Sequence, residues 1–167
     1  YKGGFDCVAI YLRNNPESRF FSKKGLILGG SHSPSPLNSE AHQGDLSAVL
    51  LQNLNPLVNL IRVPKKPIIL MDEWESKIKA IVENTWNKDV NSLSGVPSWM
   101  LVLIKAVLKK TGREYLTDVW PNLEVFFHGG ISFEPYREQY ETLIPSNKMH
   151  YMETYNASEG FFGLQDD

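Results

Sequence analysis

Three times along this chain, a short run of β-prone residues ends at glycine and a helical pattern follows. The glycines stand in Gly29-Gly30, Ser94-Gly95 and Gly129-Gly130. Strands that alternate with helices in this way are typical of right-handed βαβ units, whose strands run parallel within one sheet. The sequence therefore predicts an α/β fold with a mainly parallel sheet and helices on both faces.

The periodicity of apolar residues places the expected elements along the chain. Strands are expected at 25–30, 90–94 and 123–127, and from 149 to a polar turn that begins at Tyr155. Helices are expected at 5–13, 72–85, 99–109 and 135–144, and two further helical stretches lie on either side of Pro56. The first helix should bury Phe5, Val8, Ala9 and Leu12. We expect 31–36 to be an irregular loop because it contains two prolines.

The helix at 72–85 has the clearest amphipathic pattern. Its apolar face carries Trp74, Ile78, Ile81, Val82 and Thr85. Its opposite face carries four charged residues that we expect in solvent: Glu75, Lys77, Lys79 and Glu83.

Composition restricts the class of protein. With 167 residues, of which 42% are hydrophobic, the chain is long enough for one domain with a substantial core. A net charge of -2 makes nucleic acid or an anionic membrane a poor candidate partner. No apolar run is long enough to span a membrane, and no cleavable signal opens the chain, so the cytoplasm is the expected compartment.

Metal binding by side chains alone is not expected. Cys7 is the single cysteine, which excludes an internal disulfide and a thiolate-built zinc site. The four histidines, His32, His42, His128 and His150, lack the spacing of metal ligands. Any metal should therefore arrive together with a ligand.

The segment from Tyr155 to Glu159 combines an aromatic ring, an amide, a hydroxyl and a carboxylate within five residues. Tyr155 could stack on a base and Asn156 could read its edge. Ser158 could donate to a phosphate oxygen, and Glu159 could supply an oxygen ligand to Mg²⁺. The segment also suits a plain turn between strands, in which Asn and Ser satisfy backbone groups. Ligands of parallel sheets collect beyond the carboxyl ends of the strands, so we expect this segment and Gly129-Gly130 to share one edge.

The blocks 126–130 and 153–162 together resemble the Gretchen Hagen family of auxin-responsive acyl-acid amido synthetases, within the adenylate-forming superfamily. The resemblance is closest to the bacterial branch and covers almost the whole chain. Further matching blocks lie at 29–32, 71–75, 95–99 and 119–122.

This resemblance implies ATP and Mg²⁺ as cofactors, with a carboxylic acid and an amino acid as substrates. Gly129 and Gly130 would lie against adenine, Tyr155 would stack on it and Asn156 would read its edge. Ser158 would meet the α-phosphate and Glu159 would help to hold Mg²⁺. The residues expected to border the acyl substrate are Val96, Trp99, Phe127 and Ala157, although Val96, Trp99 and Phe127 also suit a role in the core.

The implied chemistry needs no protein nucleophile. A carboxylate attacks the α-phosphate of ATP, pyrophosphate leaves, and an amine then attacks the mixed anhydride, while the protein positions the groups and offsets negative charge. Alternative readings are an acyl-CoA ligase of the same superfamily and a binding or scaffold domain that kept the fold without the chemistry.

We expect the chain to be an internal piece of a longer protein. It starts at Tyr1 without methionine, and it stops just after a segment that looks like a strand in need of neighbours. The Ser/Gly/Thr-rich phosphate loop, the ribose-binding acid and the carboxyl-terminal lid of the family are not among these residues. The remainder of the parent chain is therefore an expected partner, and the 167 residues alone should be inactive.

Overall fold

A six-stranded sheet forms the centre of the computed structural model, which describes residues 2–30, 32–35, 38–44, 58–157 and 160–166. Five strands run parallel, and the last, at one edge, is antiparallel to its neighbour. In spatial order the strands are β4 (Arg62–Val63), β1 (Lys24–Leu28), β5 (Val90–Gly95), β6 (Val125–Gly129), β7 (His150–Ala157) and β8 (Gly160–Leu164). The predicted α/β fold with a mainly parallel sheet is confirmed.

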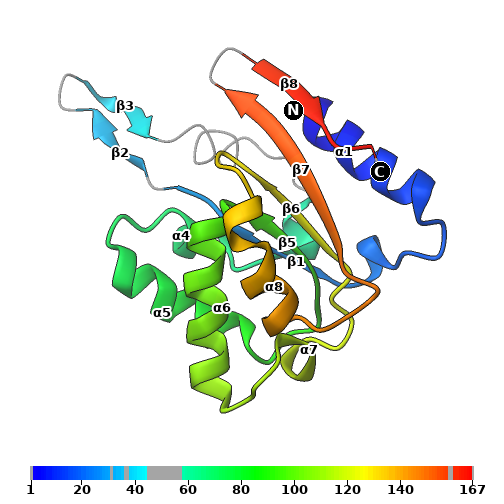
Figure 1. Cartoon of the computed structure of the whole chain (residues 1–167). Coiled ribbons are helices and arrows are strands. Elements are labelled where there is room, and N and C mark those ends of the chain that lie inside the picture. Colours follow the sequence, from blue (N-terminus) through cyan, green and yellow to red (C-terminus); the bar gives the residue numbers. More distant parts are fainter. Residues whose placement is uncertain (1, 31, 36–37, 45–57, 158–159, 167) are drawn as a thin grey trace.

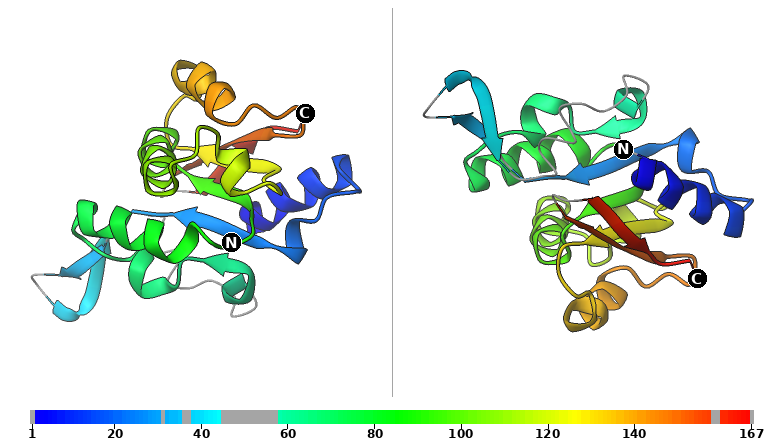
Figure 2. Two further views of the ribbon diagram at one scale, coloured as in Figure 1. Left: turned by 90° about the horizontal axis from the view of Figure 1, so that it is seen from below. Right: turned by 90° about the horizontal axis from the view of Figure 1, so that it is seen from above.

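Helices cover the two faces unequally, as Figures 1 and 2 show. Three helices lie on one face: α5 (Trp74–Thr85), α6 (Pro97–Thr111) and α8 (Arg137–Leu143). The other face carries α1 (Lys2–Asn14). Short helical segments connect these elements: η1 (Phe20–Ser22), α3 (Val58–Ile61), α4 (Lys66–Ile69), α7 (Leu116–Val119) and η2 (Glu134–Tyr136).

Alternate residues of the central strands divide between two apolar clusters. Phe126 of β6 is fully buried among residues of the three-helix face. Its neighbours Val125 and Phe127 pack on the α1 face, beside Tyr11. This is the period of two that a strand imposes on its side chains, and it decides which site residues can meet.

The ends of the helices follow the local sequence. The carboxylate of Glu73 caps α5 by accepting hydrogen bonds from the backbone N–H groups of Glu75 at 2.9 Å and Ser76 at 2.6 Å. Pro97 occupies the first turn of α6, and Gly112 ends that helix in the left-handed conformation with φ +66°. The predicted starts and ends of these helices are confirmed to within two residues.

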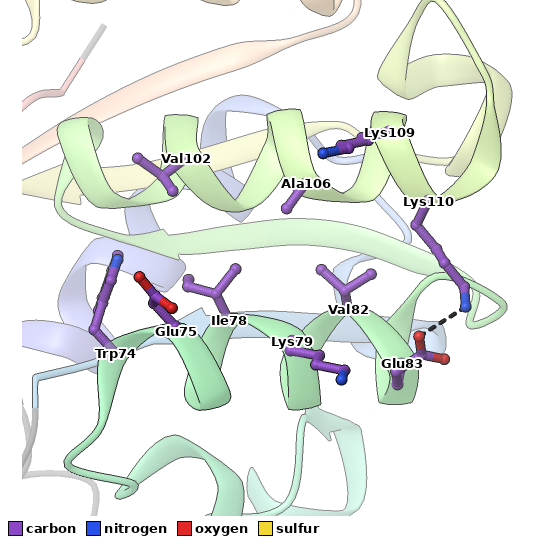
Figure 3. A pocket seen from close by; sticks show the side chains of 10 residues that line it. All are labelled: Trp74, Glu75, Ile78, Lys79, Val82, Glu83, Val102, Ala106, Lys109 and Lys110. Atoms are coloured by element: carbon purple, nitrogen blue, oxygen red, sulfur yellow. Dashed lines mark hydrogen bonds and ion pairs between the residues drawn. The ribbon is translucent and has the colours of Figure 1, made fainter.

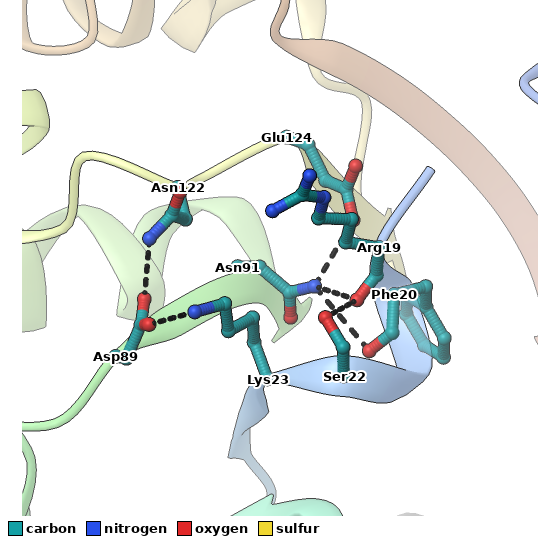
Figure 4. A network of polar contacts seen from close by, with 8 residues as sticks. All are labelled: Arg19, Phe20, Ser22, Lys23, Asp89, Asn91, Asn122 and Glu124. Carbon is teal, nitrogen blue, oxygen red and sulfur yellow. Dashed lines mark hydrogen bonds and ion pairs between the residues drawn. The ribbon is translucent and has the colours of Figure 1, made fainter. Parts of the chain in front are cut away.

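A polar network ties the amino ends of β5 and β6 to the segment after α1 (Figure 4). Asn91 Nδ2 donates to the carbonyl oxygen of Arg19 at 2.9 Å and to Oε1 of Glu124 at 3.0 Å. Nearby, Asn122 Nδ2 donates to Oδ1 of Asp89 at 2.8 Å. These contacts lie at the edge where the parallel strands begin, so they contribute to the stability of the fold at the end away from the strand exits.

The prediction of an irregular loop at 31–36 is wrong. Residues His32–Ser35 form β2 and residues Asn38–Gly44 form β3, an antiparallel ribbon separate from the main sheet. Pro34 lies within β2, opposite His42. A two-stranded ribbon consists of edge strands, where a proline can face away from the ladder and cost no hydrogen bond. The stretch at 45–57 lies outside the described residues, and of the second helical stretch the structure describes only α3.

The first helix is confirmed, but its predicted buried face is wrong. The side chains of Cys7 and Tyr11 are buried, whereas Phe5 is 55% exposed and Ala9 is exposed. Val8 and Leu12 are half-buried. The covered face follows the i, i+4 spacing of Cys7 and Tyr11, because the Tyr11 ring packs on the sheet.

Among the described residues, no helix has the length and apolarity needed to cross a bilayer.

Candidate functional site

The exits of four neighbouring parallel strands lie in a row at one edge of the sheet (Figure 1). In the register of the sheet, Leu28 of β1 is beside Gly95 of β5, and Gly95 is beside His128 of β6. Gly129 is beside Thr154 of β7. The Gly129-Gly130 turn therefore lies next to the residue that precedes Tyr155, which is the juxtaposition that the sequence predicted.

Gly129 is required by the close approach of the next strand. A Cβ atom at this position would come closer to the carbonyl oxygen of Thr154 than non-bonded atoms approach, and it would lie 2.9 Å from Thr154 Oγ1. The same hydroxyl donates to the carbonyl oxygen of His128 at 3.0 Å. Any side chain at position 129 would push β6 and β7 apart where they leave the sheet.

Gly130 is required for a different reason. Its φ of +85° is rarely adopted by residues with a side chain. A Cβ atom here would meet Val96 Cγ2 at 3.4 Å, which is ordinary contact. The turn thus presents bare backbone beside Val96, the residue that precedes helix α6.

Tyr155 and Asn156 lie within a strand, which corrects the expected polar turn. Strand β7 continues to Ala157 because it pairs with β8, and Tyr155 is opposite Gly163 while Asn156 is opposite Phe161. The register shifts by one residue between these two pairs. The Tyr155 ring is 64% exposed and packs on Phe162, with ring centroids 5.6 Å apart.

Asn156 is exposed, and Ala157 is half-buried opposite Gly160 at the end of β7. Ser158 and Glu159, the predicted phosphate and Mg²⁺ contacts, lie outside the described residues. The register shift next to Tyr155 is a bulge, a feature that is common beside binding sites because it redirects side chains.

The four residues expected around the acyl substrate do not all lie together. Val96 adjoins the Gly130 turn, and Trp99, 36% exposed in the first turn of α6, packs on Trp74 of α5 with ring centroids 5.7 Å apart. Phe127 packs at 5.8 Å on the Tyr11 ring on the opposite face of the sheet. The structure therefore places Val96 beside the Gly130 turn, pairs Trp99 with Trp74 of α5, and directs Phe127 toward α1.

His128 is a feature of the edge that sequence reasoning left unassigned. Its side chain is 2% exposed, its ring stacks on Phe133 at 4.3 Å, and neither ring nitrogen has a hydrogen-bond partner in the described part of the chain. Burial, with a smaller effect of Arg137, lowers the pKa of His128 to about 4. The imidazole is therefore neutral at neutral pH and contributes to the packing of the turn.

Lys77 is the second unexpected feature, and its predicted place in solvent is wrong. Its side chain is 2% exposed, and Nζ donates to the carbonyl oxygens of Gly29 at 2.7 Å and Gly30 at 3.1 Å. Helical spacing could have indicated its burial, since Lys77 follows Trp74 by three residues and precedes Ile81 by four, which puts it on the apolar face.

A shallow groove of about 850 Å³ runs between α5 and α6 on the outer side of the helical layer (Figure 3). Its floor is apolar, and an ion pair between Lys110 and Glu83 at 2.7 Å closes one end. Trp74 lies at the opposite end, toward the strand exits. The groove contains none of the residues that the sequence predicted for binding, so we do not assign it to the candidate site.

Comparison with models of known protein families gives a match over most of the chain. The model described as the GH3 family N-terminal domain matches residues 1–149. The matched range includes the Gly129-Gly130 turn, Val96 and Trp99, and it ends before Tyr155. A comparison with curated proteins finds no match.

Proposed function

Because this chain belongs to the GH3 family of acyl-acid amido synthetases, ATP-using acid–amine ligases, we propose that it is the central part of such an enzyme. In the proposed reaction, the enzyme adenylates a carboxylic acid and transfers the acyl group to the amine of an amino acid. The rest of the active site would come from other parts of the same polypeptide.

The observation that carries this proposal is the contact between the Gly129-Gly130 turn and the strand that leads into Tyr155. Two glycines leave the backbone bare at the edge where parallel sheets bind ligands, and the exposed Tyr155 ring is the nearest large aromatic side chain along β7. A planar base could lie between the bare glycine backbone and the Tyr155 ring. We assign adenine to this place, with Asn156 at its edge.

The glycine turn is accessible, as a nucleotide site must be. Gly130 is exposed and carries no side chain, so a ligand can approach the backbone of the turn directly. We assign the α-phosphate contact to Ser158 and the Mg²⁺ ligand to Glu159. When bound, Mg²⁺ would neutralise negative charge on the phosphates.

The protein side of the chemistry is mainly positioning. Val96 adjoins the glycine turn, and Trp99 follows it in the first turn of α6, so an acyl acid held against them would present its carboxylate near the proposed nucleotide site. Holding two reactants in the right geometry supplies much of the rate enhancement in such transfers. Ala157 is the proposed acyl contact at the end of β7.

The test uses the full-length protein that contains this chain. Carboxylic acids are screened for acid-dependent exchange of pyrophosphate into ATP, and active acids are then offered amino acids or coenzyme A. An amide product is the expected result, a thioester would favour an acyl-CoA ligase, and the absence of exchange with every acid would favour a scaffold. Glu159→Gln should reduce Mg²⁺-dependent exchange by about 100-fold, and unchanged exchange would remove Glu159 from the metal site.

A further inference from the structure

Helix α5 contacts the row of strand exits through a buried ammonium group. Lys77 Nζ donates to the carbonyl oxygens of two consecutive residues, Gly29 and Gly30, just beyond the end of β1. The side chain is 2% exposed. Burying a charged group costs free energy unless hydrogen bonds replace those lost to water, so Lys77 depends on these two carbonyl groups.

The two hydrogen bonds also define the path of the backbone. Along a regular strand, successive carbonyl groups point in opposite directions. One ammonium can reach both carbonyl oxygens only if the chain bends between Gly29 and Gly30. Lys77 therefore stabilises a bend at the exit of β1, and its removal would leave two buried acceptors without this donor.

This bend is coupled to the residues that we assign to the acyl side. The carbonyl oxygen of Leu28 would lie only 2.7 Å from a Cβ atom on Gly95, so the exit of β1 restricts the exit of β5. Gly95 leads directly into Val96. The same helix α5 touches this region a second time, where Trp74 packs on Trp99.

We propose that Lys77 is a positioning residue for the acyl-acid side of the active site. By holding the bend at Gly29 and Gly30, it fixes the path from Gly95 to Val96. The adenine side, formed by the exits of β6 and β7, has its own contacts through Gly129 and Thr154, so we expect Lys77 to affect it much less. This inference rests on the proposed function.

The experiment compares Lys77→Met with Lys79→Met in the full-length protein. Lys79 lies on the same helix, is exposed, and provides a matched loss of one charge. Steady-state kinetics with the best acid from the exchange screen should show a KM for the acid raised about tenfold in Lys77→Met, because a small misplacement of a binding surface is expensive. The KM for ATP should stay within about twofold, and Lys79→Met should behave as the wild type in both.

Two kinetic results would overturn the inference. An equal rise in both KM values would mean a general loss of structure, and unchanged values would mean that the bend does not affect the acid. If Lys77→Met does not fold, Lys77→Gln takes its place, because the amide keeps hydrogen-bond donors in a smaller side chain.

A second measurement separates this inference from the proposed function. If the wild type has no ligase activity with any acid, the proposed function fails, and hydrogen exchange then tests the coupling by itself. Amides from Gly95 to Met100 should exchange faster in Lys77→Met than in Lys79→Met, while amides around Gly129 keep their protection. Equal exchange in the two variants at Gly95 to Met100 would overturn the coupling.

Discussion

The hydroxyl of Thr154 donates to the carbonyl oxygen of His128 at 3.0 Å, across the ends of two parallel strands. This bond holds β7 against β6 where Gly129 has no room for a side chain. It explains why the glycine turn and the strand carrying Tyr155 stay together. The relationship makes the edge sensitive to very small changes.

Gly129→Ala should destabilise the protein. The new Cβ atom would collide with the backbone carbonyl of Thr154, which cannot move away as a flexible side chain could. We expect a loss of about 1–3 kcal/mol in the free energy of unfolding, measured by urea denaturation. Gly163→Ala is the control, since a Cβ atom there meets nothing within 4 Å. Equal stability of the two variants would contradict this prediction.

His128 should make the fold sensitive to acid. Burial lowers its pKa in the folded protein to about 4, whereas the unfolded chain binds the proton near the ordinary value of 6.5. The unfolded state therefore binds more protons between these values, so stability is complete above pH 6.5 and falls as the pH approaches 4, by up to about 3 kcal/mol.

The control for this prediction is His128→Phe, which keeps an aromatic ring beside Phe133 and removes the titrating group. Urea denaturation at pH 7 and pH 4.5 gives the loss of stability for each protein. The variant should lose about 2 kcal/mol less than the wild type over this interval. The same loss in both proteins would mean that other groups account for the acid sensitivity.

Tyr155→Ala should affect nucleotide binding far more than stability. Tyr155 is 64% exposed and its ring packs on Phe162, so its removal should change the free energy of unfolding by less than about 1 kcal/mol. If the ring stacks on adenine, the KM for ATP in the full-length protein should rise about tenfold. Tyr155→Phe should retain the stacking, and an unchanged KM in Tyr155→Ala would exclude Tyr155 from the adenine site.

The isolated 167-residue chain should not release pyrophosphate from ATP. The resemblance to adenylate-forming enzymes implies a phosphate loop and a mobile lid, and neither motif occurs in this sequence. A sensitive pyrophosphate assay compares the isolated chain with the full-length protein, using an acid that the full-length protein accepts. Acid-dependent release by the short chain would show that these residues suffice for adenylation.

Part of the candidate site followed from sequence order alone. The approach of the Gly129-Gly130 turn to the segment that begins at Tyr155 could be predicted because parallel strands bring their carboxyl ends to one edge, whereas the pairing of Gly129 with Thr154 came from the structure. The direction of Phe127 could not be predicted. A strand turns successive side chains to opposite faces, and only the position of α1 shows which face belongs to Phe127.

The sequence by itself determined the alternation of strands and helices, the helix ends at Pro97 and Gly112, and the parallel sheet, because these depend on spacing and backbone preferences within a few residues. Tertiary structure alone decided that the ammonium of Lys77 meets the carbonyl oxygens of Gly29 and Gly30, that 32–35 pairs with 38–44 in a ribbon and that β8 extends the strand through Tyr155. Each of these depends on a partner distant in sequence or on a pairing between strands, and such contacts leave no local pattern to read.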